Sequence, residues 1–254
     1  MKGIISPETI LDHVVAYTIG AGEVMEESLK KKHNASKYNM AMVPFGPPFY
    51  TAILQAAGVL AIKKDSKTAI LVYQQYKKSD SILLHNHDIG PILGKTFIFP
   101  TTLEKLSKAI TQFTHFTQFT QFTDSIENQM YFIRVLSSIE ELVIVGIGTE
   151  VEQKKVDAVL EYVRKALPDS TMFFVHNFSH EKEFSKCRKE DDVMITNIIK
   201  HKVKSIKDNS YQIPKIFSDY SKKLKRIPAV VAYTNTGDLG GNKQKTSGYA
   251  CLIA

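Results

Sequence analysis

The stretch SILLHNHDIGPILGK, residues 81–95, contains the residue types best suited to chemistry. Its apolar start leads into His85, His87 and Asp88, after which glycine and proline interrupt the chain. A short buried strand that ends in His-x-His is a common place for a metal ion or a general base in α/β enzymes. Histidine nitrogens with one carboxylate suit non-haem iron that keeps open positions for oxygen.

Two other segments bring polar or unusual residues to the ends of apolar runs. HNFSHEKEF supplies Asn177 and His180, and PFGP supplies Phe45. In an open α/β sheet, side chains just beyond the carboxyl ends of neighbouring strands converge on one crevice. We therefore expect Phe45, His87, Asn177 and His180 to meet, with His85 and Asp88 beside them. Taken singly, each histidine is more often a hydrogen-bonded structural residue than a ligand.

The elements that must position these residues form an alternating pattern of short apolar runs and longer segments with helical period. Strands are expected at 40–44, 68–73, 81–85, 141–148, 171–177, 229–234 and 248–253. Helices are expected at about 23–33, 48–62, 102–111, 125–138, 150–166, 182–203 and 213–225. This alternation predicts an α/β fold with a mostly parallel or mixed central sheet and helices on both faces.

Two further segments differ from this regular pattern. DSIENQMYFI opens a predicted helix with Asp124, and Glu127 lies in the first turn, where the helix dipole alone favours a carboxylate. TQFTHFTQFTQFT, residues 111–123, repeats phenylalanine every three residues, so neither a helix nor a strand would bury all four rings. We expect irregular or partly helical structure there, on the domain surface.

Length and composition place the chain among ordinary globular proteins. Its 254 residues suit one domain over 1–254, and 43% hydrophobic and 23% charged residues argue against disorder. The net charge is +7, but only four of the 33 basic residues are arginine, which makes a nucleic-acid-binding module the weakest reading. Two cysteines, no signal-peptide pattern and no spanning apolar run lead us to expect a cytoplasmic protein without a membrane partner.

Read in order, these blocks resemble the Memo family, also called AmmeMemoRadiSam system protein B. The final strands of that family read approximately YANSGDVSGDKSRVVGYAAV, and residues 233–252 read YTNTGDLGGNKQKTSGYACL. The family's P-H-A-G-Y is matched by PFGPP at 44–48, and its ILGPSHHVPL by ILLHNHDIGP at 82–91. Its EHSLEVQLPFL is matched by TDSIENQMYFI at 123–133, and its SSDFSHY block by VHNFSHEKEFSKCRKED at 175–191.

The resemblance implies a single α/β domain similar to the class III extradiol ring-cleaving dioxygenases, with a metal at the strand ends. It places His87 at the first histidine of SHH and His180 at the histidine of DFSH. Other metal-site positions have changed. Phe45 replaces the histidine of HAG, and Asn177 replaces the aspartate of DFSH. Three more pocket positions depart in the same way, with Asp88 at the second histidine of SHH, Asp124 at the histidine of EHS, and Ser210 at the family cysteine.

These substitutions support a leading hypothesis and leave one alternative open. Because a phenyl ring cannot coordinate and a serine hydroxyl is a poor ligand, we expect the inherited metal site to be degraded and to hold no cofactor. The protein would then be a non-catalytic binding or interaction protein, with an unknown protein or small molecule as partner. The alternative is a metal-dependent oxidoreductase with a rearranged iron or copper site built from His87, Asp88 and His180, with His85 in reach.

Overall fold

The computed structural model describes residues 38–62, 65–75, 79–85, 88–92, 95–100, 103, 114–117, 124–203 and 212–254. Most of its strands belong to one mixed sheet of eight strands in the order β6-β3-β7-β2-β8-β1-β10-β9. These are β6 (Thr114–Thr117), β3 (Ile82–His85), β7 (Glu141–Ile147), β2 (Thr68–Gln74), β8 (Thr171–Val175), β1 (Met40–Val43), β10 (Gly248–Ile253) and β9 (Ala229–Asn235). A separate two-stranded ribbon joins β4 (Ile89–Ile92) to β5 (Lys95–Phe97).

The centre of the sheet is parallel, and the strand that adjoins it on each side runs antiparallel. Strands β7, β2, β8 and β1 run in the same direction, with Tyr73 level with Gly146 on one side and Val175 on the other. Strand β10 runs antiparallel to β1, and β3 runs antiparallel to β7. The carboxyl ends of the four central strands therefore form one edge of the sheet, and β3 ends away from that edge.

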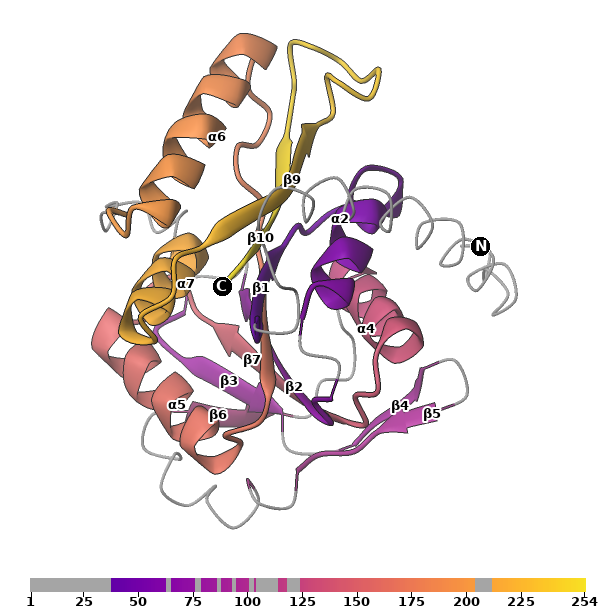
Figure 1. Cartoon of the computed structure of the whole chain (residues 1–254), viewed down its shortest axis with the longest axis vertical. Coiled ribbons are helices and arrows are strands. Elements are labelled where there is room, and N and C mark those ends of the chain that lie inside the picture. Colours follow the sequence, from indigo (N-terminus) through magenta and orange to yellow (C-terminus); the bar gives the residue numbers. More distant parts are fainter. Residues whose placement is uncertain are drawn as a thin grey trace.

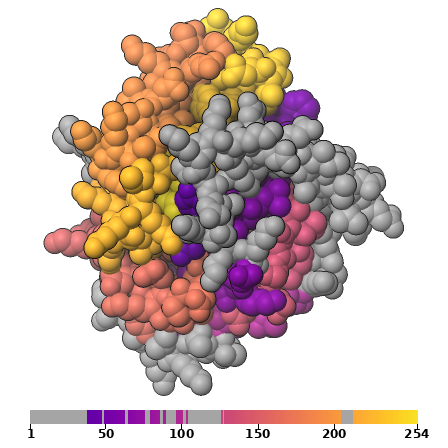
Figure 2. Space-filling view, viewed as in Figure 1, coloured from indigo at the N-terminus to yellow at the C-terminus, as the bar shows by residue number. Residues whose placement is uncertain are grey.

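Helices cover both faces of the sheet, as Figure 1 shows. Helices α2 (Pro48–Leu60) and α4 (Asp124–Leu136) pack on one face, around side chains such as Leu71 and Phe173. Helices α5 (Gln153–Ala166), α6 (Phe184–Ile199) and α7 (Gln212–Lys223) pack on the other, around side chains such as Val72 and Phe174. In the space-filling view these three helices form one continuous side of the molecule (Figure 2).

Burial explains why the central strands read as unbroken apolar runs. Residues 69–72 of β2 and 142–145 of β7 are nearly inaccessible, with neighbours in each strand facing opposite layers of helices. Because both faces are covered, these strands need no polar alternation. The α/β class with a mixed sheet and helices on both faces, predicted from the sequence, is confirmed.

The phenylalanine tract departs from its predicted conformation. Residues 114–117 form the edge strand β6, which pairs in parallel with β3 so that Leu84 lies opposite Phe116. Because β6 has four residues, it includes only one of the four repeating phenylalanines. The three-residue repeat therefore does not conflict with the two-residue alternation of side chains in this strand. The remainder of the tract lies outside the described residues, as do the predicted helix at 23–33 and all but residue 103 of the predicted helix at 102–111.

Within the described part of the chain, no helix is both long enough and apolar enough to cross a bilayer.

Candidate functional site

A cavity of about 370 Å³ lies at the carboxyl edge of the central strands. Each of the four parallel strands, or the residues that follow it, contributes to the lining. The described lining residues are Phe45, Tyr73, Gln74, Gln75, Thr149, Val175, His176, Asn177, Phe178 and His180. This volume is at the lower end of the range for small-molecule sites, which suits one compact ligand.

The cavity lies at a point where the chain connections diverge. From β2 the chain moves toward β7 and β3, whereas from β8 it continues through α6 and α7 toward β9 at the opposite margin. Because β2 and β8 are neighbours, their outgoing connections separate and leave a gap at their carboxyl ends. This arrangement is the topological switch point, the usual ligand site in open α/β sheets.

A hydrogen bond joins the loop that follows β1 to the loop that follows β8. The backbone N–H of Phe45, two residues after β1, donates to Oδ1 of Asn177 at 2.7 Å. Because an N–H group needs an acceptor, this bond fixes which end of the Asn177 amide is oxygen. The Nδ2 group of Asn177 is therefore its remaining donor.

The Gln75 amide is oriented in the opposite sense by two carbonyl groups. Its Nε2 donates to the carbonyl oxygen of Gly146 at 2.8 Å and to that of Ser81 at 3.3 Å. Oε1 of Gln75 therefore remains as an acceptor on the cavity lining. The backbone of Gln75 continues the pairing of β2 with β7, because its N–H donates to the carbonyl oxygen of Ile147 at 2.8 Å.

The two cavity histidines lie in different environments. His176 is 9% exposed, and its Nε2 has no hydrogen-bond partner within the described part of the protein. Burial lowers the pKa of His176 to about 3, so the imidazole is neutral at physiological pH. His180 is exposed, and its Nδ1 lies 3.1 Å from Oγ of Ser247.

The structure brings Phe45, Asn177 and His180 together but separates His85 and Asp88 from them. Because β3 is antiparallel to β7, it runs away from the cavity edge, and Nδ1 of His85 accepts the N–H of Ile144 in mid-strand at 2.7 Å. His85 is fully buried and its ring packs edge-on against Phe99, 5.3 Å between centroids. The expectation that His85 shares the crevice is wrong, since the strand-end argument assumed a parallel strand.

Asp88 lies beside the amino end of β7. Its Oδ1 accepts the N–H of Phe99 at 2.7 Å, and the neighbouring Ile98 is tied to Leu142 near the start of that strand. The distance from Leu142 to the carboxyl end of β7 is roughly 16 Å along a strand. Asp88 therefore lies near the amino end of β7, whereas His180 lies beyond the carboxyl end of β8.

Four other candidates have no described side chain. His87 and Ser210 lie outside the described residues, so their predicted places are untested. Asp124 begins α4 as predicted, and Glu127 follows in its first turn, but neither side chain is described. Helix α4 runs opposite to β7, which follows it closely, so its first turn points toward the cavity edge of the sheet.

Sequence reasoning missed the cavity residues Tyr73, Gln74, Gln75 and Thr149. The signal that could have found the first three is the strand TAILVYQQ, whose carboxyl end is the direct neighbour of β8. Glutamine is neither a metal ligand nor a titratable group, so a search of the sequence for such groups does not select it. Burial raises the pKa of Tyr73 to about 12, so it contributes a neutral phenol.

A buried polar cluster lies behind the cavity loop and was also missed. Asp191 of α6 is 1% exposed, and it accepts hydrogen bonds from the Ser179 N–H at 2.8 Å and the Tyr233 hydroxyl at 2.7 Å. The Cys187 thiol lies 3.5 Å from the same carboxylate. Burial raises the pKa of Asp191 above its ordinary range despite these donors. The cluster joins the cavity loop to α6 and β9.

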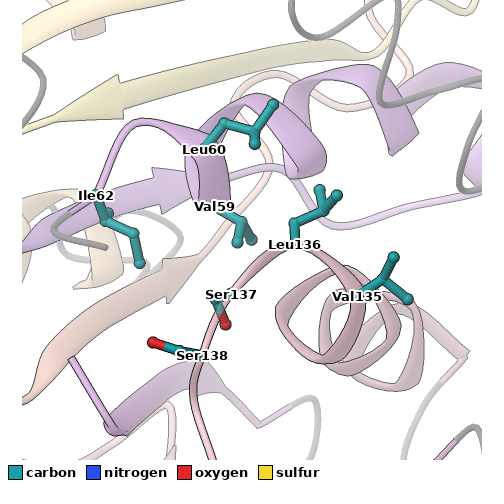
Figure 3. Close-up of a pocket in the computed structure, with 7 residues that line it drawn as sticks. All are labelled: Val59, Leu60, Ile62, Val135, Leu136, Ser137 and Ser138. Atoms are coloured by element: carbon teal, nitrogen blue, oxygen red, sulfur yellow. The ribbon is translucent and has the colours of Figure 1, made fainter. Parts of the chain in front are cut away.

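A second cavity, of about 360 Å³, opens between the carboxyl ends of α2 and α4 (Figure 3). Its lining is mostly aliphatic, with Leu60 and Leu136 from the two helices and the hydroxyl groups of Ser137 and Ser138. Because both helices lead into the amino ends of strands, this gap lies at the sheet edge opposite the first cavity. Among the described residues, its lining contains no titratable or metal-ligating side chain, so we place the candidate site at the carboxyl edge.

The chain was compared with known families and with curated proteins, and neither a family model nor a curated sequence matches it.

Proposed function

We propose that this chain is a Memo-like protein with a degraded metal site, acting as a non-catalytic binding protein through its carboxyl-edge cavity. The observation that carries the proposal is the 2.7 Å hydrogen bond between Phe45 and Asn177. By the resemblance, these two positions belong to a metal-binding histidine and a nearby aspartate. A phenylalanine and an asparagine now occupy them, and both residues line one cavity.

The remaining donors favour uncharged ligands over a resident metal. Among the described lining residues, nitrogen and oxygen come from imidazole, amide, hydroxyl and phenol groups, and no carboxylate or thiolate is included. Non-haem iron sites use histidine together with carboxylate, so this set lacks the anionic member. The oxidoreductase alternative would have to rely on His176 and His180, without Asp88.

Metal analysis of the untagged protein tests the proposal. The protein is incubated anaerobically with excess ferrous iron, and separately with copper, then dialysed and analysed for bound metal. We expect well below one ion per chain. One ion per chain that is lost in His180→Ala, His176→Ala or His87→Ala would overturn the proposal and favour the oxidoreductase. An ion retained by all three variants would be bound elsewhere and would leave the cavity assignment intact.

A further inference from the structure

The two amides at the cavity present one donor and one acceptor whose orientations are fixed by the backbone. Asn177 presents Nδ2 because Oδ1 accepts the Phe45 N–H, and Gln75 presents Oε1 because Nε2 donates to Gly146 and Ser81. Within the described chain, neither Nδ2 of Asn177 nor Oε1 of Gln75 has a hydrogen-bond partner. Both residues line the same cavity.

A third polar group is buried beside them. His176 is nine-tenths buried, and its Nε2 has no partner within the described structure. A buried polar atom without a partner is costly and uncommon in native proteins, so His176 adds an unsatisfied polar group to the wall of the cavity. The neutral imidazole can complement either a donor or an acceptor, according to its tautomer.

The lining combines aromatic rings with uncharged polar groups. Phe45, Phe178 and Tyr73 contribute rings, and no Asp, Glu, Lys or Arg is found among the described lining residues. A ligand carboxylate would lose its hydration without gaining a fixed cation, and a ligand cation would find no carboxylate. Flat, uncharged ligands that stack on rings avoid both costs.

We propose that the cavity binds a small, neutral aromatic compound through an amide or lactam edge, which offers one acceptor to Asn177 and one donor to Gln75. The inference rests on the proposed function, because it requires a cavity without a resident metal. The ligand class follows from the pairing of one donor with one acceptor in the same lining. A carboxylate offers two acceptors and an amidinium offers two donors. Of these three groups, only the amide or lactam edge has one of each.

The test uses three probes of the same size and shape: benzamide, benzoate and benzamidinium. Titration of the ¹⁵N-labelled protein with each probe gives the dissociation constant, and the shifted backbone amides report the site. We expect benzamide to bind at least about tenfold more tightly than either ion. Each ion would leave a polar group wrongly paired or its own charge uncompensated in the cavity. The largest shifts should fall on Phe45, Gln75 and Asn177.

Asn177→Asp is the informative variant, because Oδ1 can still accept the Phe45 N–H while the donor becomes a charged acceptor. We expect its preference to move to benzamidinium by about tenfold or more relative to wild type. Asn242→Asp is the matched control. Asn242 lies in an exposed loop, and its Oδ1 likewise accepts a backbone N–H, from Gln244 at 2.9 Å, so the charge change is the same. The control should keep the wild-type order of affinities.

The outcomes separate this inference from the proposed function. Binding at the cavity in which benzoate or benzamidinium equals or exceeds benzamide overturns the ligand class and leaves a binding protein. An absence of cavity shifts with all three probes also overturns the ligand class. The probes are tested at concentrations on the order of 10 mM, which suits weak fragments. A stoichiometric cavity metal overturns the proposed function itself. If Asn177→Asp fails to fold, the wild-type ranking and shift map still decide.

Discussion

At the scale of single residues, the carboxyl-edge cavity differs from a metal site by very few atoms. The backbone N–H of Phe45 donates to the side chain of Asn177, and both residues line one cavity. His180 lines the same cavity. Replacing the phenyl ring by imidazole and the amide by carboxylate would assemble two histidines and one carboxylate, the donor set that suits ferrous iron.

We therefore predict that Phe45→His with Asn177→Asp gains transition-metal affinity that neither single change provides. Ligands to one ion act as a set, and a half-built site leaves the ion partly hydrated. Titration with cobalt(II), followed by its visible absorption and by calorimetry, measures the gain. The gain should disappear when His180→Ala is added. A double variant that binds no more cobalt than wild type would show that the three side chains do not converge.

His176 predicts a loss of stability in acid. Burial lowers its pKa from 6.5 to about 3, so the folded state keeps the imidazole neutral while the unfolded chain takes up a proton below pH 6.5. The stabilisation is therefore complete above pH 6.5 and is lost as the pH falls toward 3. At pH 5 the loss from this group is about 2 kcal/mol.

Urea unfolding of wild type and His176→Gln between pH 7.5 and 5 measures this effect, because glutamine does not titrate. We expect the stability of wild type to fall more steeply, by about 2 kcal/mol over that range. His180→Gln, which removes an exposed imidazole, is the control and should follow wild type. Parallel curves for wild type and His176→Gln would mean that His176 titrates normally.

At the scale of elements, the Asp191 cluster fixes how α6 packs on β10. Gly248 begins β10, and a methyl group at that position would lie 1.7 Å from Oδ2 of Asp191. Only a residue without a side chain lets the carboxylate approach the strand while it accepts the Tyr233 hydroxyl. The glycine in SGYA is thus explained by close packing of a helix carboxylate, not by its backbone angles.

This contact predicts strong coupling between residues 191 and 248. Gly248→Ala should destabilise wild type by about 3 kcal/mol, in the range for overpacked buried sites, and by at least 1 kcal/mol less in an Asp191→Ser background. Chemical denaturation of the four proteins gives the coupling energy. Additive effects at 191 and 248 would contradict the contact.

Most elements of the sheet could be predicted from the sequence, but the direction of one strand could not. All seven predicted strands are found, since buried apolar runs bounded by turns are a local signal. The direction of β3 depends on its pairing with β7, a contact between distant segments that leaves no periodic trace. Phe45, Asn177 and His180 follow parallel strands and line one cavity, whereas His85 ends a strand that runs the other way.

At the scale of the whole molecule, strand order determines where a ligand can bind. The connections from β2 and β8 diverge, and this divergence creates the gap that Gln75 and Asn177 line. The sequence predicted that a strand-end crevice exists, because it follows from the α/β class. It did not predict that β2 supplies a wall of it, because neighbours in the sheet are 100 residues apart along the chain, as with Leu71 and Phe173.

His85 is separated from the cavity histidines because β3 runs antiparallel to β7. An engineered disulfide can test that strand direction. Ile82 and Ile147 are direct partners across the β3–β7 pair, and both face the same core. Opposed residues in an antiparallel pair have Cα atoms about 4.5–5.5 Å apart, which is within disulfide range. We predict that Ile82→Cys with Ile147→Cys forms a disulfide on mild oxidation, detected by mass spectrometry after proteolysis.

Ile82→Cys with Val143→Cys is the matched control and should remain reduced, because Val143 lies near the other end of β7. Cross-linking of the control pair in place of the first would show that β3 runs parallel to β7, which would return His85 to the cavity edge. If both pairs destabilise the fold, nuclear Overhauser contacts between Leu83 and Gly146 in the wild-type protein decide the same question.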